Sequence, residues 1–340
     1  MSIGEASAAN APTLERVAEL AGVSRSTVSR VVNGSPNVTP EVVTAVTAAI
    51  DRLGYVPNRA ARSLASRRTH AIALVIPENT AKFFADPYFA SVIQGAAMYL
   101  ADTEYTLSLL IASETESEKT RRYLQGGNVD GALILSHHSD DSSYVQLSQR
   151  MPVVFGGRPM SEDSSQSYFV DVDNVAAARE ATQYLIDHGK KNIATISGPH
   201  DMASGIDRTQ GWREALEAAG LDASLHEEGD FSPSGGEQAM RRLLDRGQPI
   251  DGLFAASAQM ASGALVALRE HGLRVPEDIG IVSIDNDYYA QNSLPPLTTI
   301  DQPSVRQGSA IAEVVVRLIN GEDVPRRTII PTHLIERQSV

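Results

Sequence analysis

Residues 13–33 read TLERVAELAGVSRSTVSRVVN. Apolar residues in the first part recur at i, i+3, i+4 and i+7, which predicts a helix over Leu14–Ala21. Thr13 is a favourable capping residue before this helix, and Gly22 is suited to end it in the left-handed conformation. A second apolar repeat predicts a helix over Arg25–Val32. Two short helices joined by a glycine turn are typical of a helix-turn-helix.

The second helix is expected to begin after a cap at Ser24 and to turn its three valines inward. Its outward side chains would then be Arg25, Ser26, Ser29 and Arg30. Arginine binds guanine O6 and N7 with two hydrogen bonds, whereas hydroxyls and helix-terminal amides suit phosphates. The pattern therefore predicts a helix that reads DNA, and the alternative is a three-helix bundle whose basic face is only solvated.

The same head continues with a third helix and a linker. Thr39-Pro40-Glu41 has the composition of a helix start, so a helix is expected over Glu41–Leu53, closed by Gly54. Asn58–Ser66 has helical spacing but few large apolar residues. This segment is expected to be a linker that folds when it gains a partner.

The net charge of −13 is unevenly distributed along the 340 residues. Residues 1–70 hold 8 Arg, no Lys and 5 acidic residues, which gives +3, and the remainder carries −16. A basic head on an acidic body favours a polyanionic partner for the head, and accidental clustering is the alternative.

From Ala71 onward, short apolar runs alternate with amphipathic helices. The expected strands are Ala71–Ile76, Tyr105–Ile111, Gly131–Leu135, Val153–Phe155, Ile193–Ser197, Gly252–Ala255 and Ile279–Ile284. The expected helices are Pro87–Ala101, Glu116–Gln125, Asn174–His188, Ile206–Ala219, Gly235–Arg246, Gln259–His271 and Ser304–Asn320. This alternation predicts an α/β body with parallel sheets covered on both faces, and its length favours two doubly wound, Rossmann-like lobes.

Several segments of the head resemble a known family. They are TLERVA (13–18), AGVS (21–24), TVSRVVN (27–33), LGYVPN (53–58) and AARSL (60–64). Dense and in order, they are similar to the DNA-binding head of the lactose/galactose-repressor (LacI/GalR) family. The resemblance continues more sparsely through the body to about Gln302. It implies a helix-turn-helix head on a body of periplasmic-binding-protein type.

The resemblance also implies roles for residues of the head. Arg25, Ser26 and Arg30 would read bases, and Thr27, Ser29, Asn33, Thr39, Tyr55 and Asn58 would hold phosphates. Asn58–Ala65 would form a hinge helix that pairs with its dimer mate in the minor groove, where Leu64 would be wedged into the central base step. Ser24, Arg59 and Ala61 are expected at the same DNA-binding surface.

Candidate ligand groups follow the apolar strands of the body, where doubly wound lobes bind ligands. Asp86-Pro87-Tyr88-Phe89 follows the first strand, and Asp201–Arg208, Ser257 and Asp285 follow later ones. Carboxylates, an arginine and an aromatic ring suit a polyhydroxylated ligand, because they offer paired hydrogen bonds and a flat apolar face.

The resemblance implies effector contacts at Tyr88, Phe89, Arg208, Asp285 and Gln302, with Ser204 in the same loop as Arg208. One departure concerns the residues before Gln259. The family often has Asn-Asp there, whereas this chain has Ser257-Ala258. The departure leaves open which effector binds and whether a sugar is contacted at this point.

Other residues favour ordinary structural roles. Trp212 is expected in the core, and Asp285 and Arg208 have a strand-end cap and a surface ion pair as alternatives. His137-His138 is expected at a loop or at the rim of the effector site, because adjacent side chains at a strand end point apart and chelate poorly. No metal or cofactor is expected.

The composition and motifs exclude several classes of protein. The chain has no Cys, which excludes disulfides and thiol catalysis. Apolar runs such as Ala71–Ile76 are too short to span a membrane, and Met1–Pro12 lacks the features of a secretory signal. The common phosphate-binding, dinucleotide-binding, serine-hydrolase and zinc-protease motifs are absent, so no catalytic residues are expected.

The sequence therefore predicts a cytoplasmic, nucleoid-associated, homodimeric transcription regulator, most simply a repressor of a palindromic operator. Its expected parts are a DNA-binding domain (12–57), a hinge (58–68) and an effector-binding and dimerisation domain (70–340). The effector is expected to be a small molecule, with a sugar favoured, acting as inducer or corepressor. The alternatives are a stand-alone sugar-binding protein of periplasmic type and an architectural DNA binder without a sensor.

Overall fold

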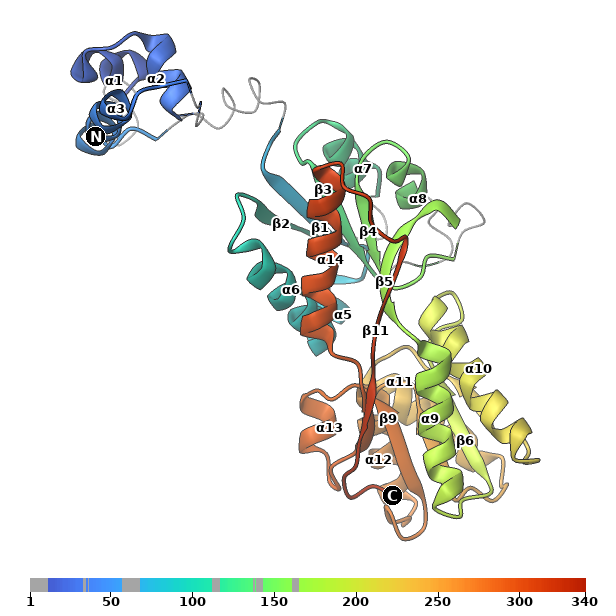
Figure 1. Cartoon of the computed structure of the whole chain (residues 1–340). Coiled ribbons are helices and arrows are strands. Elements are labelled where there is room, and N and C mark those ends of the chain that lie inside the picture. Colours follow the sequence, from blue (N-terminus) through green and yellow to red (C-terminus); the bar gives the residue numbers. More distant parts are fainter. Residues whose placement is uncertain are drawn as a thin grey trace. The chain divides into compact units, whose positions relative to one another are not determined.

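The computed structural model describes residues 12–32, 35, 37–56, 68–111, 117–136, 138, 143–160 and 165–340. The chain divides after His70 into two compact units (Figure 1). No helix among the described residues combines the length and the apolar character needed to cross a membrane.

The first unit holds three helices: α1 (Leu14–Ala21), α2 (Arg25–Val32) and α3 (Pro40–Leu53). The first two have the bounds expected from the sequence. One apolar side chain from each helix is fully buried at the centre of the unit, namely Val17, Val28 and Val46. Gly22 ends α1 with a φ of 66°, as a left-handed cap requires.

The helix starts agree with the expected caps at two of three positions. Thr13 Oγ1 accepts a hydrogen bond from the Arg16 amide at 3.4 Å, and Ser24 Oγ accepts one from the Thr27 amide at 3.1 Å. Thr39 occupies the cap position of α3, but its side chain makes no capping hydrogen bond. Its hydroxyl bonds the carboxylate of Glu41 instead. The expected linker Asn58–Ser66 lies outside the described residues.

The second unit contains two six-stranded sheets, one in each of two lobes. We call the lobe formed by residues 71–172 and 304–330 the N-lobe. Its strands are β1 (Ala71–Ile76), β2 (Thr106–Ile111), β3 (Gly131–Leu135), β4 (Val153–Gly156), β5 (Tyr168–Val172) and β11 (Arg327–Ile330). They pair in parallel in the order β11-β5-β4-β3-β1-β2.

Helices cover both faces of the N-lobe sheet. On one face, α6 (Pro87–Leu100) and α14 (Ser304–Ile319) pack against Ile72, Leu74 and Ile76 of β1 (Figure 1). On the other face, α7 (Ser117–Gln125) and α8 (Ser143–Ser148) cover the alternate residues of the same strands. A short helix, α5 (Thr80–Ala85), follows β1. Burial on both faces explains why β1 reads as a continuous apolar run.

We call the lobe formed by residues 174–301 and 333–340 the C-lobe. Its strands are β6 (Ile193–Ser197), β7 (His226–Glu228), β8 (Gly252–Ala255), β9 (Gly280–Ile284), β10 (Thr298–Asp301) and β12 (His333–Ile335). They are ordered β12-β10-β9-β8-β6-β7, and β12 alone pairs antiparallel. Its helices are α9 (Asn174–Asp187), α10 (Ala203–Ala218), α11 (Pro233–Asp245), α12 (Ala258–Glu270) and α13 (Tyr288–Asn292).

The two faces of the C-lobe sheet have separate cores. The helices α11 and α12 cover one face, and α9 and α10 cover the other. Trp212 of α10 is fully buried in the second core, where its indole N–H donates to the Ile193 carbonyl at 3.3 Å. The expected core role of this residue is confirmed.

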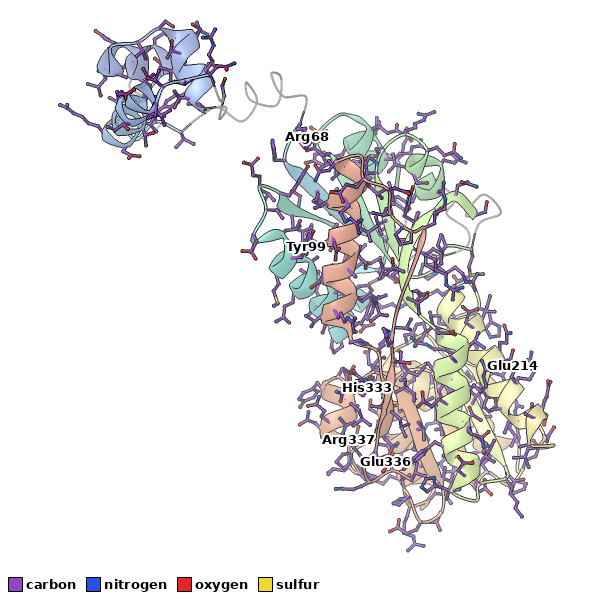
Figure 2. All side chains as sticks on the ribbon, in the orientation of Figure 1. Arg68, Tyr99, Glu214, His333, Glu336 and Arg337 are labelled. Carbon is purple, nitrogen blue, oxygen red and sulfur yellow. The ribbon has the colours of Figure 1, made fainter. Side chains whose placement is uncertain are left out.

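The chain passes between the lobes three times: between Val172 and Asn174, between Asp301 and Ser304, and between Ile330 and His333. At the third crossing, His333 Nε2 lies 3.6 Å from Asp301 Oδ2, beside the second crossing (Figure 2). Because the carboxyl ends of the parallel strands of both lobes lie toward these crossings, the space between the lobes is the natural ligand site.

Candidate effector cavity and DNA-binding surface

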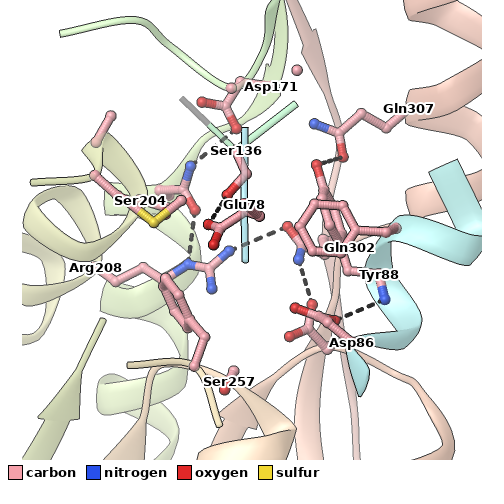
Figure 3. A pocket seen from close by; sticks show the side chains of 18 of the residues that line it. Glu78, Asp86, Tyr88, Ser136, Asp171, Ser204, Arg208, Ser257, Gln302 and Gln307 are labelled. Atoms are coloured by element: carbon pink, nitrogen blue, oxygen red, sulfur yellow. Dashed lines mark hydrogen bonds between the residues drawn. The ribbon is translucent and has the colours of Figure 1, made fainter. Parts of the chain in front are cut away.

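A cavity of about 850 Å³, open to solvent, lies between the two lobes. All seven residues expected to contact an effector line it: Tyr88, Phe89, Ser204, Arg208, Ser257, Asp285 and Gln302. They come from both lobes and from the second crossing, and Figure 3 shows Arg208, Gln302 and Tyr88 among the side chains that surround the cavity. The structure therefore brings together residues that are more than 200 positions apart in the sequence.

Arg208 on α10 is the central cation of the cavity and is 4% exposed, so the alternative of a surface ion pair is wrong. Its Nε donates to Asn174 Oδ1 at 2.8 Å, and its Nη2 donates to Gln302 Oε1 at 3.2 Å. Its Nη1 donates to the Ala256 carbonyl at 2.6 Å. These bonds use three of the five guanidinium donors within the described chain, which leaves two for a ligand.

Asp285 sits at the end of β9 with a φ of 85°, a strained backbone conformation for a residue with a side chain. Gln302 donates from its amide nitrogen to Asp285 Oδ1. Burial raises the pKa of Asp285, and the positive charge of Arg208 opposes that rise. The side chain thus forms part of the cavity network with Gln302 and Arg208.

Two further carboxylates add negative charge near Asp285. Burial raises the pKa of Asp86 to about 7, and the nearby charges of Asp285 and Asp287 contribute to the rise. Burial likewise raises the pKa of Asp287 to about 6. Asp86 also caps α6, because its Oδ1 accepts from the Tyr88 amide at 2.9 Å.

The two aromatic candidates differ in how they face the cavity. Tyr88 donates from its hydroxyl to Gln307 Oε1 at 3.2 Å, and burial raises the pKa of that hydroxyl. Phe89 is only 3% exposed and packs in the N-lobe core. Tyr88 can therefore offer both a ring and a polar atom, whereas Phe89 mainly fixes the wall.

The hydroxyl candidates also have distinct environments. Ser257 caps α12, with its Oγ accepting from the Met260 amide at 3.2 Å. Ser204 lies one turn before Arg208 on α10. The ring of Phe231 also lines the cavity, and its centroid lies 5.9 Å from the Arg208 guanidinium carbon.

Sequence reasoning missed several cavity residues. Asp171 lies within β5, a strand that the sequence pattern did not predict, and Asn174 follows that strand. Glu78 follows β1, a strand that was predicted, so the same strand-end rule could have found it. Further polar residues that line the cavity are Lys82, Ser136, Arg158, Gln259 and Gln307.

The Asp171 carboxylate accepts hydrogen bonds from residues at and near the first crossing between the lobes. Its Oδ2 accepts from the Arg158 amide at 2.9 Å, and its Oδ1 accepts from the Val172 amide and from Asn174 Nδ2. Burial raises the pKa of this carboxyl. Since Asn174 also receives Arg208 Nε, one connected network joins Asp171, Arg208 and Gln302.

His138 contacts Glu78, which lines the cavity, and it also contacts Asp201. Its neighbour His137 lies outside the described residues. Among the residues that the structure describes, no group of three or more His, Asp or Glu has the arrangement of a metal site.

The outer face of α2 carries the side chains expected to contact DNA. Arg25, Ser26 and Arg30 are exposed. The hydroxyl of Ser24 lies 2.8 Å from those of both Ser26 and Thr27, so this turn presents a hydrogen-bonded row of hydroxyls. Arg25 also lies 3.0 Å from Glu15 of α1, with both side chains more than half exposed.

The remaining DNA candidates divide into two groups. Ser29 and Thr39 are described and lie at or near the surface, whereas Tyr55 is 9% exposed and packs in the core of the unit. A phosphate contact by Tyr55 would involve only the small exposed part of its side chain. Asn33, Asn58, Arg59, Ala61 and Leu64 lie outside the described residues.

Two family models match parts of this chain. Residues 13–58 match the bacterial regulatory proteins of the lacI family, and residues 182–340 match a periplasmic binding protein-like domain. Among curated proteins, the HTH-type transcriptional regulator CelR of Thermobifida fusca is 46% identical over 96% of this chain and 98% of its own length. The chain belongs to the lacI family.

Other relatives of this lacI-family chain give a consistent result. Catabolite control protein A of Priestia megaterium is 32% identical over 96% of the chain and 98% of its own length. A solved structure of a transcriptional regulator CelR–cellobiose complex is 45% identical, with a TM-score of 0.77 over 97% of this chain and 100% of that one. A lac repressor dimer bound to operator and the anti-inducer ONPF is 27% identical, with a TM-score of 0.85 over 97% of this chain and 99% of that one.

These findings confirm the family and the fold predicted from the sequence: a helix-turn-helix head and a two-lobed α/β body. They also confirm the predicted class of function, a DNA-binding transcription regulator. The relatives named here are regulators and not enzymes.

Proposed function

We propose that this protein is a homodimeric repressor that binds a near-palindromic operator and that a neutral saccharide of the cellobiose class controls its release. The observation that carries the proposal is the connected network of Arg208, Gln302 and Asp285 inside a two-lobed cavity. The likeness over nearly the whole chain to a CelR–cellobiose complex supports the class of ligand.

The chemistry of the cavity favours a neutral, polyhydroxylated ligand. Carboxylates and amide groups accept and donate paired hydrogen bonds to sugar hydroxyls, and Arg208 supplies a fixed fork of donors. Four carboxyl groups line the space: Glu78, Asp86, Asp171 and Asp285. A sugar phosphate would bring further negative charge among them, so phosphorylated ligands are disfavoured.

The DNA-binding half of the proposal rests on α2 and on dimer symmetry. Arg25, Ser26 and Arg30 would read base edges in the major groove, while the remaining head candidates would hold phosphates. Two heads related by a two-fold axis would read the two half-sites of a palindrome. Leu64 would enter the minor groove at the centre, where an apolar wedge unstacks a base step and permits a bend. The parts proposed for this action are residues 12–57, 58–68 and 70–340, located with bacterial DNA in the cytoplasm.

Control would operate through the two lobes. An effector that binds one relative arrangement of the lobes better than another shifts the equilibrium between operator-binding states, with a coupling of ~1–3 kcal/mol. We propose release by the ligand, and tightening of the operator complex is the outcome that would assign a corepressor.

Selection from a random duplex pool followed by fluorescence anisotropy tests the whole proposal. The full-length protein should enrich a symmetric site at moderate ionic strength, and cellobiose should lower its affinity for that site. Glucose 6-phosphate serves as the charged comparison ligand and should have no effect. Failure to enrich any symmetric site would refute the DNA half, and an affinity unchanged by neutral mono- and disaccharides would refute the effector half.

A further inference from the structure

Four polar side chains form a bridge between the lobes at the edge of the cavity. Glu78 follows β1, and Ser136 and His138 follow β3, so these three belong to the N-lobe. Asp201 lies between β6 and α10 in the C-lobe.

Among the described residues, the hydrogen bonds that hold the Glu78 carboxylate are all made to one of its two oxygens, Oε1. Its Oε1 accepts hydrogen bonds from Ser136 Oγ, from His138 Nε2 at 2.9 Å and from Lys82 Nζ at 3.4 Å. Within the described part of the chain, no hydrogen bond to Oε2 is formed. The side chain is 3% exposed and lines the cavity, and Figure 3 shows its carboxylate turned toward the centre of the site. A carboxylate oxygen that faces a cavity is a strong acceptor for a ligand hydroxyl.

His138 contacts one carboxylate from each lobe. Its Nε2 faces Glu78 Oε1 at 2.9 Å, and its Nδ1 faces Asp201 Oδ2 at 2.7 Å. Because both partners are carboxylates, both ring nitrogens must donate, and this requires the protonated imidazolium. The hydrogen bond to Glu78, with help from Asp201, raises the pKa of His138 to about 9 although burial opposes the rise.

We propose that Glu78 is a ligand-contacting carboxylate that selects hydroxyl-bearing ligands, and that His138 couples this contact to closure of the lobes by joining Glu78 to Asp201. The proposal deepens the saccharide-controlled function proposed above and rests on it. A single side chain, His138, transmits the coupling. A ligand hydroxyl bound to Oε2 fixes the Glu78 carboxylate, and Glu78 then orients the His138 imidazole toward Asp201.

Geometry on the C-lobe side supports the coupling. Asp201 lies just before α10, and Ser204, Asp207 and Arg208 share one face at the start of that helix. Asp207 bonds Arg158 of the N-lobe at 2.7 Å, which provides a second ion pair across the opening. Separation of the lobes would break both pairs, but only the His138 pair reaches a cavity-lining carboxylate. Asp201 Oδ1 is buried and lacks a partner among the described residues, so separation would also return that oxygen to water.

Distance measurements between the lobes test the coupling. The chain has no Cys, so Arg150→Cys on the N-lobe and Glu217→Cys on the C-lobe give a pair of exposed spin-label sites without background. The doubly labelled full-length protein is compared with the same protein carrying His138→Gln, whose single amide donor group cannot join both carboxylates. Asp201→Ala removes the acceptor of His138 Nδ1, so it breaks the same bridge from the more exposed side and guards against misfolding of the first variant. His188→Ala is the control, because the hydrogen bond of the His188 ring within the described part of the chain is to the Tyr184 carbonyl at the end of α9.

We expect both bridge variants, but not the control, to shift the ligand-free distance distribution toward longer distances. If both variants give the same distance distribution as the labelled protein that keeps His138 and Asp201, the proposed role of His138 would be overturned. Cellobiose titration of Glu78→Gln should show at least a 10-fold loss of affinity, whereas Glu217→Gln should show none. Unchanged affinity in Glu78→Gln would overturn the ligand contact. Absence of saccharide binding by the unsubstituted protein would refute the proposed effector, and the ligand-free distances would still decide whether His138 joins the lobes.

Discussion

Arg208 of the C-lobe donates a hydrogen bond to Gln302, a residue in the second crossing between the lobes, at 3.2 Å. The same guanidinium bonds Asn174, which lies at the first crossing. Arg208 lines the ligand cavity and is therefore hydrogen-bonded to residues at two of the three crossings about which the lobes can move. This arrangement gives a ligand a short physical route to the relative position of the lobes.

Arg208→Lys should abolish effector control while leaving operator binding intact. Lysine keeps the charge but lacks the planar fork, so it cannot bond Asn174, Ala256 and Gln302 together. Saccharide affinity should fall by about 100-fold, which corresponds to ~2.8 kcal/mol. Calorimetric titration measures the affinity, and anisotropy with operator DNA measures the retained binding. Arg213→Lys, on the exposed face of the same helix, should change neither.

Arg25→Ala should weaken operator binding by ~1–3 kcal/mol without unfolding the head. The side chain is 72% exposed, and its pairing with Glu15 is a surface contact of little energetic weight. Anisotropy should show a larger loss on the selected operator than on random duplex. Arg52→Ala removes the same charge from α3 and should reduce both affinities equally and slightly. Equal losses on the two duplexes in Arg25→Ala would mean that this residue holds phosphate and reads no base.

The elements that the sequence predicted best are those whose signal is local. β1 has the bounds expected from its six-residue apolar run, and α1 and α2 match their caps and apolar spacing. β5 was missed because Asp171 interrupts its apolar pattern, and the four-residue β10 begins with two threonines. Short strands of this kind are specified by their neighbours in the sheet and not by their own residues.

The site shows the same division between local and non-local information. Tyr88, Arg208 and Asp285 could be found because each follows a recognisable strand or motif. Asp171 was hidden with its missed strand. The partnership of His138 with Asp201 depends on how two lobes face each other, and no spacing within either segment encodes that.

Gly95→Ala should destabilise the N-lobe by ~1–3 kcal/mol or more. A Cβ atom at Gly95 of α6 would lie 1.8 Å from the Val305 carbonyl oxygen of α14, and one at Gly308 would lie 2.0 Å from that of Val92. The two helices therefore approach through a reciprocal pair of glycines, and backbone must move to admit a methyl group. Urea unfolding measures the loss. Gln94→Ala, on the exposed side of α6, is the control and should stay within ~0.5 kcal/mol of the unsubstituted protein.

Asp86→Asn should raise the melting temperature above neutral pH. Asparagine can still cap α6 through the Tyr88 amide, but it removes a charge that faces Asp285 and Asp287. The folded pKa of Asp86 is raised to about 7 from an ordinary value of 3.8, so the folded protein loses stability as pH rises between these values. The variant does not lose this stability. Its melting temperature should therefore exceed that of the unsubstituted protein most above pH 7, and the difference should disappear toward pH 4. Thermal melts across this range check the sign, and an advantage that is constant with pH would contradict the role of charge.

His138→Gln should remove a pH-dependent part of the stability of the body. The folded pKa of His138 is raised to about 9 by Glu78 and Asp201, above the ordinary value of 6.5. The group therefore contributes stability that is complete below about pH 6.5 and is lost as pH rises through about 9. Besides these two carboxylates, Lys82 is the charged group among the described residues that contacts the cluster, through Glu78.

The melting temperatures of the unsubstituted protein and of His138→Gln should accordingly differ most at pH 6 and converge by pH 9.5. A gap of about 2–4 °C at pH 6 corresponds to roughly 1 kcal/mol for a body of this size. His188→Ala should leave the pH profile parallel to that of the unsubstituted protein, because His188 has no carboxylate partner among its described contacts. Groups that titrate in both proteins cancel in the difference between their melting temperatures. Convergence of the two melting temperatures at high pH would therefore report the loss of the proton from His138. A gap of constant size from pH 6 to 9.5 would show that His138 acts through packing and not through its charge.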